Sequence, residues 1–521
     1  MSASPVAASS AITCSELDQS RAAGISAWSL LLLLIIANFA LQPPTEPDFG
    51  WHLRTGLDVL RMGLPLPSAD PYSHTMPDWR WVEHAWLTDV LIAAIYSTFG
   101  ALAVICFFAA VTISAWLIGA AVASAGLACR WLACAVSLWV ALPYLGARTQ
   151  FITLLGLAVL SWLLKRSQEG SGAAQWWIPP LFVLWANLHG GFVAGLLLLG
   201  LVIGASAVVR WLADRRIACF TCDEPVFSWS DLKRLTVISA ISACVTLLNP
   251  YGWRLHAEIV DSLSNRFMLD TLQEWQPLSL STLAGRRYAL YLAGLGVGMA
   301  LWYRRIQPIR WVVGAVFLAF SFRHMRNIPF FLVASLPLCA EVLSDGFAAV
   351  RRRWLREEIV MKKVSFAAAL LMAAILVWEG PDHVQRIVLS GTRPVEYFKS
   401  TSYPIEAVEW MRAHPDQTGH RLYNDYGYGG FLLWWMPGTK IFIDGRMPAW
   451  RTGERVILRD YMALTGENPD ITILEKYSVD WALVRNGTSL DATLARQPGW
   501  NRVYEDHKAS IYRLAATTPA F

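Results

Sequence analysis

The first 380 residues contain a succession of apolar segments that approach the length needed to cross a lipid bilayer, about 20 residues for a helix. Over the whole chain 55% of the residues are hydrophobic and 16% are charged, whereas soluble proteins carry about 25% charged residues. This pattern excludes a soluble enzyme, a secreted disulfide scaffold and a disordered regulator. It predicts an α-helical polytopic membrane protein with about eleven spans. The predicted spans are residues 27–43, 101–125, 129–146, 150–165, 176–189, 191–213, 234–249, 287–303, 308–322, 327–346 and 364–379.

Lys and Arg collect in four of the connecting loops, and cytoplasmic loops are the ones enriched in these residues. The four basic loops are 165–166, 210–234, 304–310 and 351–363. Placing them inside makes residues 1–26 a cytoplasmic N-terminal tail and turns the loop 44–84 outward. We therefore expect a multi-pass protein of the cytoplasmic (inner) membrane, with its N-terminus inside and its C-terminal domain on the outer, periplasmic side. The net charge of +5 is too small and too scattered to indicate nucleic-acid binding.

Residues 85–99 do not fit this assignment of the loops to the two sides of the membrane. The segment is apolar, but counting it as a span reverses the side of every later basic loop. It is also short and carries Asp89. We therefore predict a helix on the outer face that lies in the interface or dips partway into the membrane. A twelve-span arrangement, in which this segment does cross, and an arrangement with slipped span boundaries both stay open.

The composition changes near residue 381, and short β-rich runs then alternate with helical patterns. This predicts a three-part chain: the tail 1–26, a transmembrane module 27–380 with the large first outer loop 44–84, and a small α/β domain 381–521. Alternation of this kind favours a mostly parallel sheet. The expected helices are 404–415, 430–435 and 454–476, and the expected strands are 420–426, 440–446, 479–484, 501–507 and 509–514.

The first outer loop holds an unusual density of chemically active side chains. It opens with EPDFGWHLRTG (46–56) and closes with WRWVEHA (79–85). A carboxylate near the bilayer edge can take a proton from an acceptor hydroxyl, and Arg or His can hold a phosphate. The competing interpretation is an interfacial belt of aromatic residues and satisfied surface charges. The candidate site residues in this loop are Glu46, Asp48, His52, Arg54, Glu83 and His84.

Other predicted outward turns bring polar side chains to the same side of the membrane. Ionisable groups at membrane depth are expensive, so they indicate function by default. The candidates in these turns are Arg148, Gln150, Asn187, His189 and Arg326, and the turns Asn249-Pro250-Tyr251-Gly252 and Glu274-Trp275 face the same way. We predict that these residues and the first loop form one substrate-binding face.

Two motifs mark the C-terminal domain. NDYGYGG (424–430) lacks the Gly-Lys-Ser/Thr of a phosphate-binding loop, so its glycines are expected to permit a tight turn from strand to helix. IDGR (443–446) ends a predicted strand, where it serves either acceptor recognition or the capping of the sheet.

The acidic pair after the first span, the outer helix behind the loop and the many-span core with an outer C-terminal domain resemble the GT-C glycosyltransferases. These are polytopic membrane enzymes such as protein O-mannosyltransferases and aminoarabinose transferases. Over most of the chain, the motifs are similar to those of bacterial membrane proteins described only as glycosyltransferases. The motifs are EPDFGWHLRTG, WVEHAWL, WANLHGG, LNPYG and NDYGYGGFLLWW followed by IFIDGR.

The resemblance implies an enzyme that transfers a hexose or pentose from a polyprenyl-phosphate carrier to a lipid or glycan acceptor of the cell envelope, with inversion. Asp48 matches the family's first-loop Asp, which acts as a base or helps to bind a metal, and Glu46 is the neighbouring candidate. Many relatives have an acid in the second outer loop, where this chain has Arg148-Thr149-Gln150. That departure suits donor-phosphate binding by Arg148. No cofactor is certain, and a divalent cation (Mg²⁺ or Mn²⁺), held by Asp48 if by any residue, stays open.

Two non-enzymatic functions are alternatives to the glycosyltransferase hypothesis. A transporter or flippase for a lipid-linked glycan predicts inverted halves and broken helices that meet at mid-membrane, and no internal repeat is visible. A scaffold subunit of an envelope-assembly complex predicts that the carboxylates of the first loop are dispensable.

Overall fold

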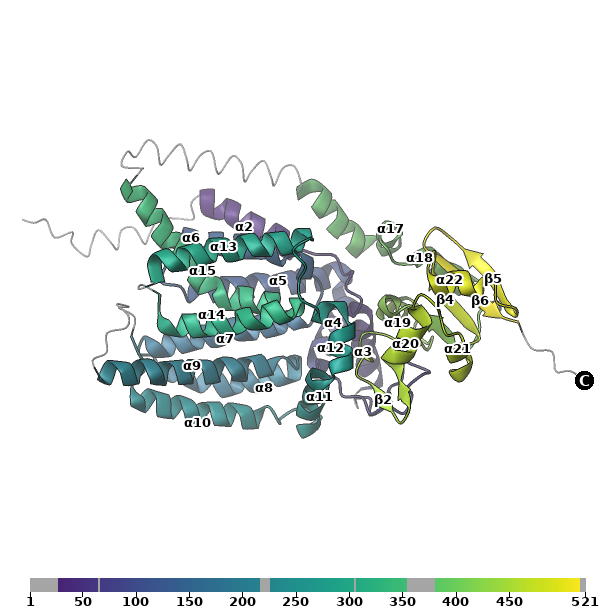
Figure 1. Ribbon diagram of the computed structural model, residues 1–521, viewed down its shortest axis with the longest axis horizontal. Coiled ribbons are helices and arrows are strands. Elements are labelled where there is room, and N and C mark those ends of the chain that lie inside the picture. Colours follow the sequence, from purple (N-terminus) through teal and green to yellow (C-terminus); the bar gives the residue numbers. More distant parts are fainter. Residues whose placement is uncertain (1–26, 64–65, 216–224, 304–305, 354–379, 516–521) are drawn as a thin grey trace, which may run out of the picture.

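The computed structural model describes residues 27–63, 66–215, 225–303, 306–353 and 380–515. The predicted tail 1–26 and the predicted span 364–379 lie outside the described residues. Figure 1 shows a bundle of long helices that run side by side, a small domain with the sheet at the C-terminal end, and a layer of shorter helices between the two.

The bundle confirms helices at ten of the predicted spans. They are α2 (Ala27–Ala40), α5 (Ala101–Ala121), α6 (Leu127–Ala141), α7 (Gln150–Gln168), α8 (Ile178–Leu188), α9 (Phe192–Asp214), α10 (Trp229–Val245), α13 (Leu283–Trp302), α14 (Pro308–Arg323) and α15 (Ile328–Arg353). Among the described residues, four helical stretches are both long and apolar enough to cross a membrane: Ala101–Ala121, Leu127–Tyr144, Phe192–Asp214 and Met325–Val350. The count of eleven spans is therefore not confirmed.

The layer at the end of the bundle consists of α3 (Phe49–Met62), α4 (Trp86–Phe99), α11 (Trp253–Ser264) and α12 (Arg266–Thr271). α4 is the helix predicted at 85–99. It has 14 residues, shorter than the roughly 20 that a span requires. Figure 1 places it in this junction layer. The layer matters because the polar candidates of the first outer loop lie on α3 or directly before it or α4. His52 and Arg54 lie on α3, Glu46 and Asp48 directly before it, and Glu83 and His84 directly before α4.

The C-terminal domain contains a four-stranded sheet in the order β1-β4-β6-β5. Its strands are β1 (Leu422–Asn424), β4 (Trp481–Arg485), β5 (Trp500–Glu505) and β6 (Ala509–Leu514), and a separate short ribbon pairs β2 (Arg451–Thr452) with β3 (Arg455–Val456). Only β1 and β4 are parallel, whereas β6 is antiparallel to both of its neighbours. The prediction of a mostly parallel sheet is wrong, because the last two strands form a hairpin that adds to the edge of β4.

The sequence pattern predicted part of the helices of this domain. The helices include α17 (Pro394–Lys399), α18 (Ile405–Ala413), α19 (Gly429–Trp435), α20 (Ile457–Thr465), α21 (Thr472–Lys476) and α22 (Ser489–Leu494). Of these, α17 and α22 were not predicted. The single helix expected over 454–476 is two helices, because the stretch GENPD at 466–470 interrupts it with Gly and Pro.

The segment 440–446 is not a strand of the sheet. Its one β-bridge pairs Ile441 with Ser73 of the first outer loop. The buried Asn424 side chain makes the hydrogen bonds that a neighbouring strand would otherwise make. It accepts one from the Phe442 backbone N–H at 2.8 Å and donates one to the Ile443 carbonyl at 2.8 Å. An amide side chain supplies both a donor and an acceptor, so it satisfies a buried backbone that has no neighbouring strand.

The first outer loop packs into the core of the C-terminal domain. Trp51, Tyr72 and Trp81 belong to the same buried cluster as the hydrophobic residues of the sheet. α3 crosses α19 so closely that a Cβ atom added at Gly50 would lie 1.9 Å from the Gly430 carbonyl oxygen. The GYGG motif therefore permits a helix crossing, as well as the turn from β1 into α19.

A buried ion-pair cluster, the Arg446 clamp, fastens the same two parts together. Arg446 Nη1 lies 2.6 Å from Asp70 Oδ1 in the loop, and Arg446 Nε lies 2.8 Å from Asp444 Oδ2. The three side chains are at most 1% exposed. The guanidinium also lies over the rings of Tyr72 and Trp81, about 5 Å from each centroid. The IDGR motif thus ties the loop to the domain.

Candidate functional site

Charged residues from four separate segments meet in the junction layer, and we refer to them as the acid–arginine cluster. The set comprises Glu46, Asp48, Arg148, Glu274 and Arg326. Arg148 Nε lies 2.5 Å from Glu46 Oε2, and Arg326 forms an ion pair with Glu274. Asp48 and Glu274 both act on Glu46 and on Arg326 electrostatically, which unites the two ion pairs in one site.

Asp48 lies at the N-terminus of α3, where its carboxylate can bind a ligand. It occupies the capping position, yet its side chain makes no capping hydrogen bond. Instead it accepts a hydrogen bond from Trp51 Nε1 at 3.1 Å. The positive end of the helix dipole favours a carboxylate here. The acid side chain is therefore fixed in direction and keeps lone pairs for a ligand.

The C-terminal domain forms one wall of this cluster. A Cβ atom added at Gly445 would lie 1.7 Å from Asp48 Oδ1, so the carboxylate rests directly against the backbone of the IDGR motif. The Tyr426 hydroxyl of the NDYGYGG motif is close enough for Asp48 and Arg326 to act on it electrostatically. Both C-terminal motifs therefore border Asp48.

Glu46 has the most perturbed acid–base behaviour in the cluster. Burial raises the pKa of Glu46 to about 7, while Arg148 lowers it and the neighbouring carboxylates of Asp48 and Glu274 raise it. A glutamate that titrates near neutral pH can accept or give up a proton under physiological conditions.

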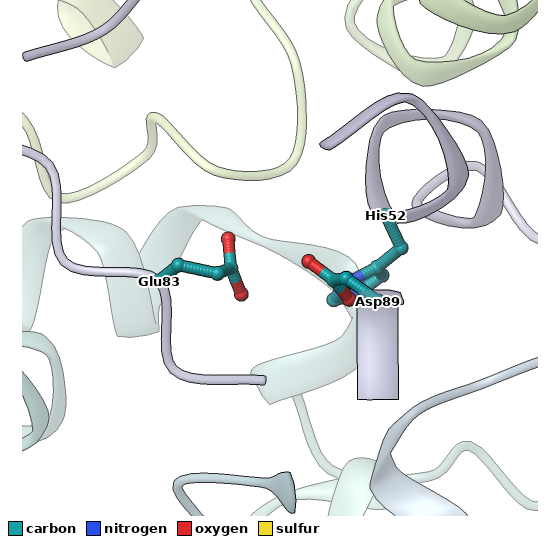
Figure 2. Close-up of side chains that lie close together, drawn as sticks. All are labelled: His52, Glu83 and Asp89. Atoms are coloured by element: carbon teal, nitrogen blue, oxygen red, sulfur yellow. The ribbon is translucent and has the colours of Figure 1, made fainter. Parts of the chain in front are cut away.

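A second group, the His–Glu–Asp triad, lies one helical turn further along α3. It consists of His52 in α3, Glu83 at the end of the first loop and Asp89 in α4. His52 Nδ1 lies 2.7 Å from Asp89 Oδ1, and the three possible ligand atoms all lie within 4.8 Å of one another. Figure 2 shows the two carboxyl groups and the imidazole pointing toward one common space. All three side chains are buried.

The triad has the donor atoms of a metal site, one imidazole nitrogen and two carboxylates. Among the described residues it is the group with metal-ligand spacing, and Asp48 does not belong to it. Burial raises the pKa of the Glu83 carboxyl, and the nearby Asp89 raises it further. A group of this kind holds either protons or a cation.

The remaining histidines of the predicted face line up beside the triad. The His84 ring lies 6.1 Å from that of His52 and 5.5 Å from that of His189, measured between centroids. His189 Nδ1 accepts a hydrogen bond from the Gly191 backbone N–H at 2.9 Å and lies 2.8 Å from Thr153 Oγ1. The predicted candidates His52, His84 and His189 thus form a row.

Three predicted site residues are engaged elsewhere. Arg54 forms a two-pronged ion pair with Asp58, four residues along the same helix. Asn187 accepts a hydrogen bond from Trp86 and donates to two backbone carbonyls, so it ties α4 to the bundle. Gln150 donates to the Arg326 backbone carbonyl at 3.1 Å, which supports the turn that carries this arginine.

Asp89 of the triad and Tyr426, which borders Asp48, were not singled out as site candidates from the sequence. A signal existed for Asp89, because an acid in an otherwise apolar helix is expensive and indicates a partner. Tyr426 gave none, since its approach to Asp48 depends on how the two parts of the chain pack.

Comparisons with known proteins identify the fold. No protein-family model matches the sequence, and no curated protein sequence does either. The oligosaccharyltransferase of Archaeoglobus fulgidus tethered to an acceptor peptide is 13% identical with a TM-score of 0.52, and its alignment covers 88% of this chain and 69% of that one. The same archaeal protein, AglB, bound to an inhibitory peptide and a dolichol-phosphate, is 12% identical over the same shares with a TM-score of 0.51.

A looser match is ArnT from Cupriavidus metallidurans bound to undecaprenyl phosphate. It is 13% identical, its alignment covers 94% of this chain and 97% of that one, and its TM-score is 0.48. This chain therefore shares its fold with the archaeal oligosaccharyltransferase.

Proposed function

We propose that this chain, which has the GT-C fold of membrane glycosyltransferases as its motifs predicted, is itself a membrane glycosyltransferase. It takes a sugar from a polyprenyl-phosphate carrier and transfers it to an envelope acceptor on the outer face of the cytoplasmic membrane. The solved relative that binds a dolichol-phosphate and a peptide supports a lipid-linked donor and a separate acceptor.

The observation that carries this proposal is that Asp48 belongs to the same charged cluster as two arginines: it acts electrostatically on Arg326 and on Glu46, the ion-pair partner of Arg148. Arg148 and Arg326 each have one carboxylate partner, Glu46 and Glu274. A guanidinium presents several N–H donors in a fixed fork, and one carboxylate leaves some of them free. Those donors suit the phosphate of a lipid carrier, because Arg binds phosphate in a planar, two-pronged manner.

In the proposed reaction Asp48 acts as the base. Its carboxylate accepts the proton of the acceptor hydroxyl while the acceptor oxygen attacks the anomeric carbon. The bond from that carbon to the phosphate oxygen breaks on the opposite face, so the configuration inverts. Arg148 and Arg326 stabilise the charge that develops on the leaving phosphate.

The other residues near Asp48 are proposed to position the substrates. Glu46 controls the direction of Arg148 and exchanges a proton near neutral pH. Tyr426 and the Gly445 backbone bring the C-terminal domain to the acceptor side of Asp48. His84 and His189 are expected to contact the sugar.

The test compares envelope glycans by mass spectrometry in the wild type, a deletion strain and complemented strains at matched membrane levels. Asp48→Asn keeps the shape of the side chain and removes the base, so transfer should fall by about 10²- to 10⁴-fold. Asp58→Asn is the matched control, since Asp58 lies on the same helix and pairs with Arg54. Full rescue by Asp48→Asn would refute the proposal and favour a transport or scaffold role.

A further inference from the structure

We propose that His52, Glu83 and Asp89 bind a divalent metal ion, and that this resident metal lies at the triad and away from Asp48. The three ligand atoms lie within 4.8 Å of one another, and the side chains point toward one space (Figure 2). Metal–ligand bonds to imidazole and carboxylate measure about 2.0–2.2 Å, so small side-chain rotations bring all three atoms onto one ion.

The strongest support comes from two orphaned carboxylate oxygens. Glu83 Oε2 and Asp89 Oδ2 are buried, and neither has a hydrogen-bond partner among the described residues. Both side chains are 0% exposed. Buried polar atoms are almost always paired, so one unpaired oxygen on each of two neighbouring carboxyl groups indicates a further partner. A cation satisfies both of them.

The charge of the triad supports the same conclusion. Two carboxylates and a neutral imidazole carry a formal charge of −2, which one divalent ion neutralises. The guanidinium that acts on Glu83 electrostatically is that of Arg446, and it is already paired with Asp70 and Asp444. Buried charges without a partner are strongly unfavourable, so a bound ion stabilises this part of the fold.

The residues around the three proposed ligands make the contacts that usually orient metal ligands in proteins. A metal-ligating histidine usually donates its other ring N–H to an oxygen. With Nδ1 on the metal, His52 Nε2 faces Thr149 Oγ1 at 3.3 Å. Glu83 Oε1 accepts a hydrogen bond from the Ala85 backbone N–H at 2.9 Å, and the Trp51 ring stacks on His52 at 3.5 Å between centroids. These contacts fix the direction of two ligands.

The donor set points to a transition metal. Carboxylates alone suit Mg²⁺ or Ca²⁺, whereas an imidazole nitrogen together with carboxylates suits Zn²⁺ or Mn²⁺. Three protein ligands leave coordination positions for water. Thr149 of the second outer loop is not a proposed metal ligand, but it contacts the ligand His52 and orients it.

The metal joins α3 to α4 behind the proposed catalytic base. His52 lies one turn after Asp48 on α3, Asp89 lies on α4 and Glu83 precedes that helix. The ion therefore holds the helix that positions Asp48. This consequence for catalysis rests on the proposed function, whereas metal binding itself does not.

The experiment measures metal in the detergent-purified full-length protein. The protein is equilibrated separately with Mn²⁺, Zn²⁺ and Mg²⁺, passed through a desalting column and analysed by mass spectrometry for metals. We expect about one Mn²⁺ or Zn²⁺ per chain. Glu83→Gln and Asp89→Asn should bind the ion at least about 100-fold more weakly, and Thr149→Val about 10- to 100-fold more weakly. Asp48→Asn and Asp58→Asn should keep the metal.

Thermal unfolding keeps the test independent of any folding defect in the variants. EDTA should lower the melting temperature of the wild type and of Asp48→Asn, and it should leave those of Glu83→Gln and Asp89→Asn unchanged. Loss of metal from Asp48→Asn to the same extent as from Glu83→Gln would place the ion at Asp48 and overturn the inference. So would wild-type protein that retains none of the three ions and is insensitive to EDTA. An inactive Asp48→Asn protein that retains its metal would support both proposals separately.

Discussion

The acid–arginine cluster and the His–Glu–Asp triad begin one turn apart on α3, at Asp48 and His52. In the first, both arginines have carboxylate partners, and the side chains of the Glu46–Arg148 pair are 13% and 26% exposed. In the second, two carboxylates are 0% exposed, and the described residues give them imidazoles as ion-pair partners: Asp89 lies 2.7 Å from His52, and Glu83 lies 3.9 Å from His84. Carboxylates therefore occur in two different electrostatic environments at one junction, one with arginine partners and one with imidazole partners.

The difference separates a site for an exchanging ligand from a site for a resident one. Paired, partly exposed charges are stable without a ligand, and a phosphate can compete for the guanidinium groups and leave again. Buried carboxylates without a guanidinium or ammonium partner are unfavourable until a proton or cation joins them. We infer that substrate binds at the acid–arginine cluster and is released from it, whereas the metal ion stays bound at the triad.

The largest expected effect tests whether buried carboxylates in this layer need a cation. Arg446→Gln would leave Asp70 and Asp444 buried without their guanidinium, which makes the Arg446 clamp resemble the triad without a cation partner. Breaking a buried pair in this way lowers the free energy of unfolding by about 3–5 kcal/mol. Urea-induced unfolding of the purified protein, followed by tryptophan fluorescence, measures the change.

A surface pair provides the control for this prediction. Arg451 pairs with Asp261, and their side chains are 54% and 38% exposed, so Arg451→Gln should change the free energy of unfolding by less than about 1 kcal/mol. Equal effects of the two substitutions would show that burial does not set the strength of these pairs, and the contrast between the cluster and the triad would fail.

The second prediction disturbs the acid–arginine cluster while sparing the triad. A methyl group at Gly445 would overlap Asp48 Oδ1, so Gly445→Ala must displace the carboxylate. A displacement of about 1 Å at a reacting group costs roughly 10²-fold in rate. Transfer activity should fall by that factor and the metal content should stay unchanged. Gly466→Ala, where an added Cβ meets its first neighbour at 3.5 Å, is the matched control. Loss of metal in Gly445→Ala would show that the two sites are one.

Much of this arrangement could be predicted from local sequence. Runs of apolar residues predicted ten of the bundle helices, and the failure of 85–99 to fit the orientation rule predicted the short helix α4 of the junction layer. Glu46, Asp48, Arg148 and Arg326 were predicted on chemical grounds to share one face, and the structure brings them together. These successes depend on hydrophobicity and residue type, which local patterns carry.

The rest depends on contacts between distant segments. The segment 440–446 has the sequence pattern of a strand but joins no sheet. Ile441 forms its β-bridge with the first outer loop, and the Asn424 side chain hydrogen-bonds the backbone beside it. His52 and Asp89 are 37 residues apart and meet only because α3 packs on α4. Arg54 is a different case: it was predicted to bind substrate, whereas it pairs with Asp58 at i+4, a partner that the helix rule for such pairs could have indicated.

The smallest expected effect is a pH dependence that belongs to the acid–arginine cluster alone. The pKa of Glu46 rises from 4.5 to about 7 because burial disfavours its charge, although Arg148 opposes the shift and Asp48 and Glu274 add to it. Between these values the folded protein binds more protons than the unfolded chain. Glu46 therefore contributes its full stabilisation below about pH 4.5 and loses it as the pH rises through 7.

The difference between wild type and Glu46→Gln isolates this contribution from all other titrating groups. The wild-type free energy of unfolding should fall by about 1–3 kcal/mol relative to the variant between pH 5 and pH 8, and the difference should then level off. Denaturant unfolding at intervals of half a pH unit measures it, with Glu454→Gln as the control for an exposed glutamate. A difference that stays constant over this range would mean that the ion pair with Arg148 keeps Glu46 charged throughout. Both arginines would then be permanently neutralised, and a donor phosphate would have to displace a charged carboxylate to reach Arg148.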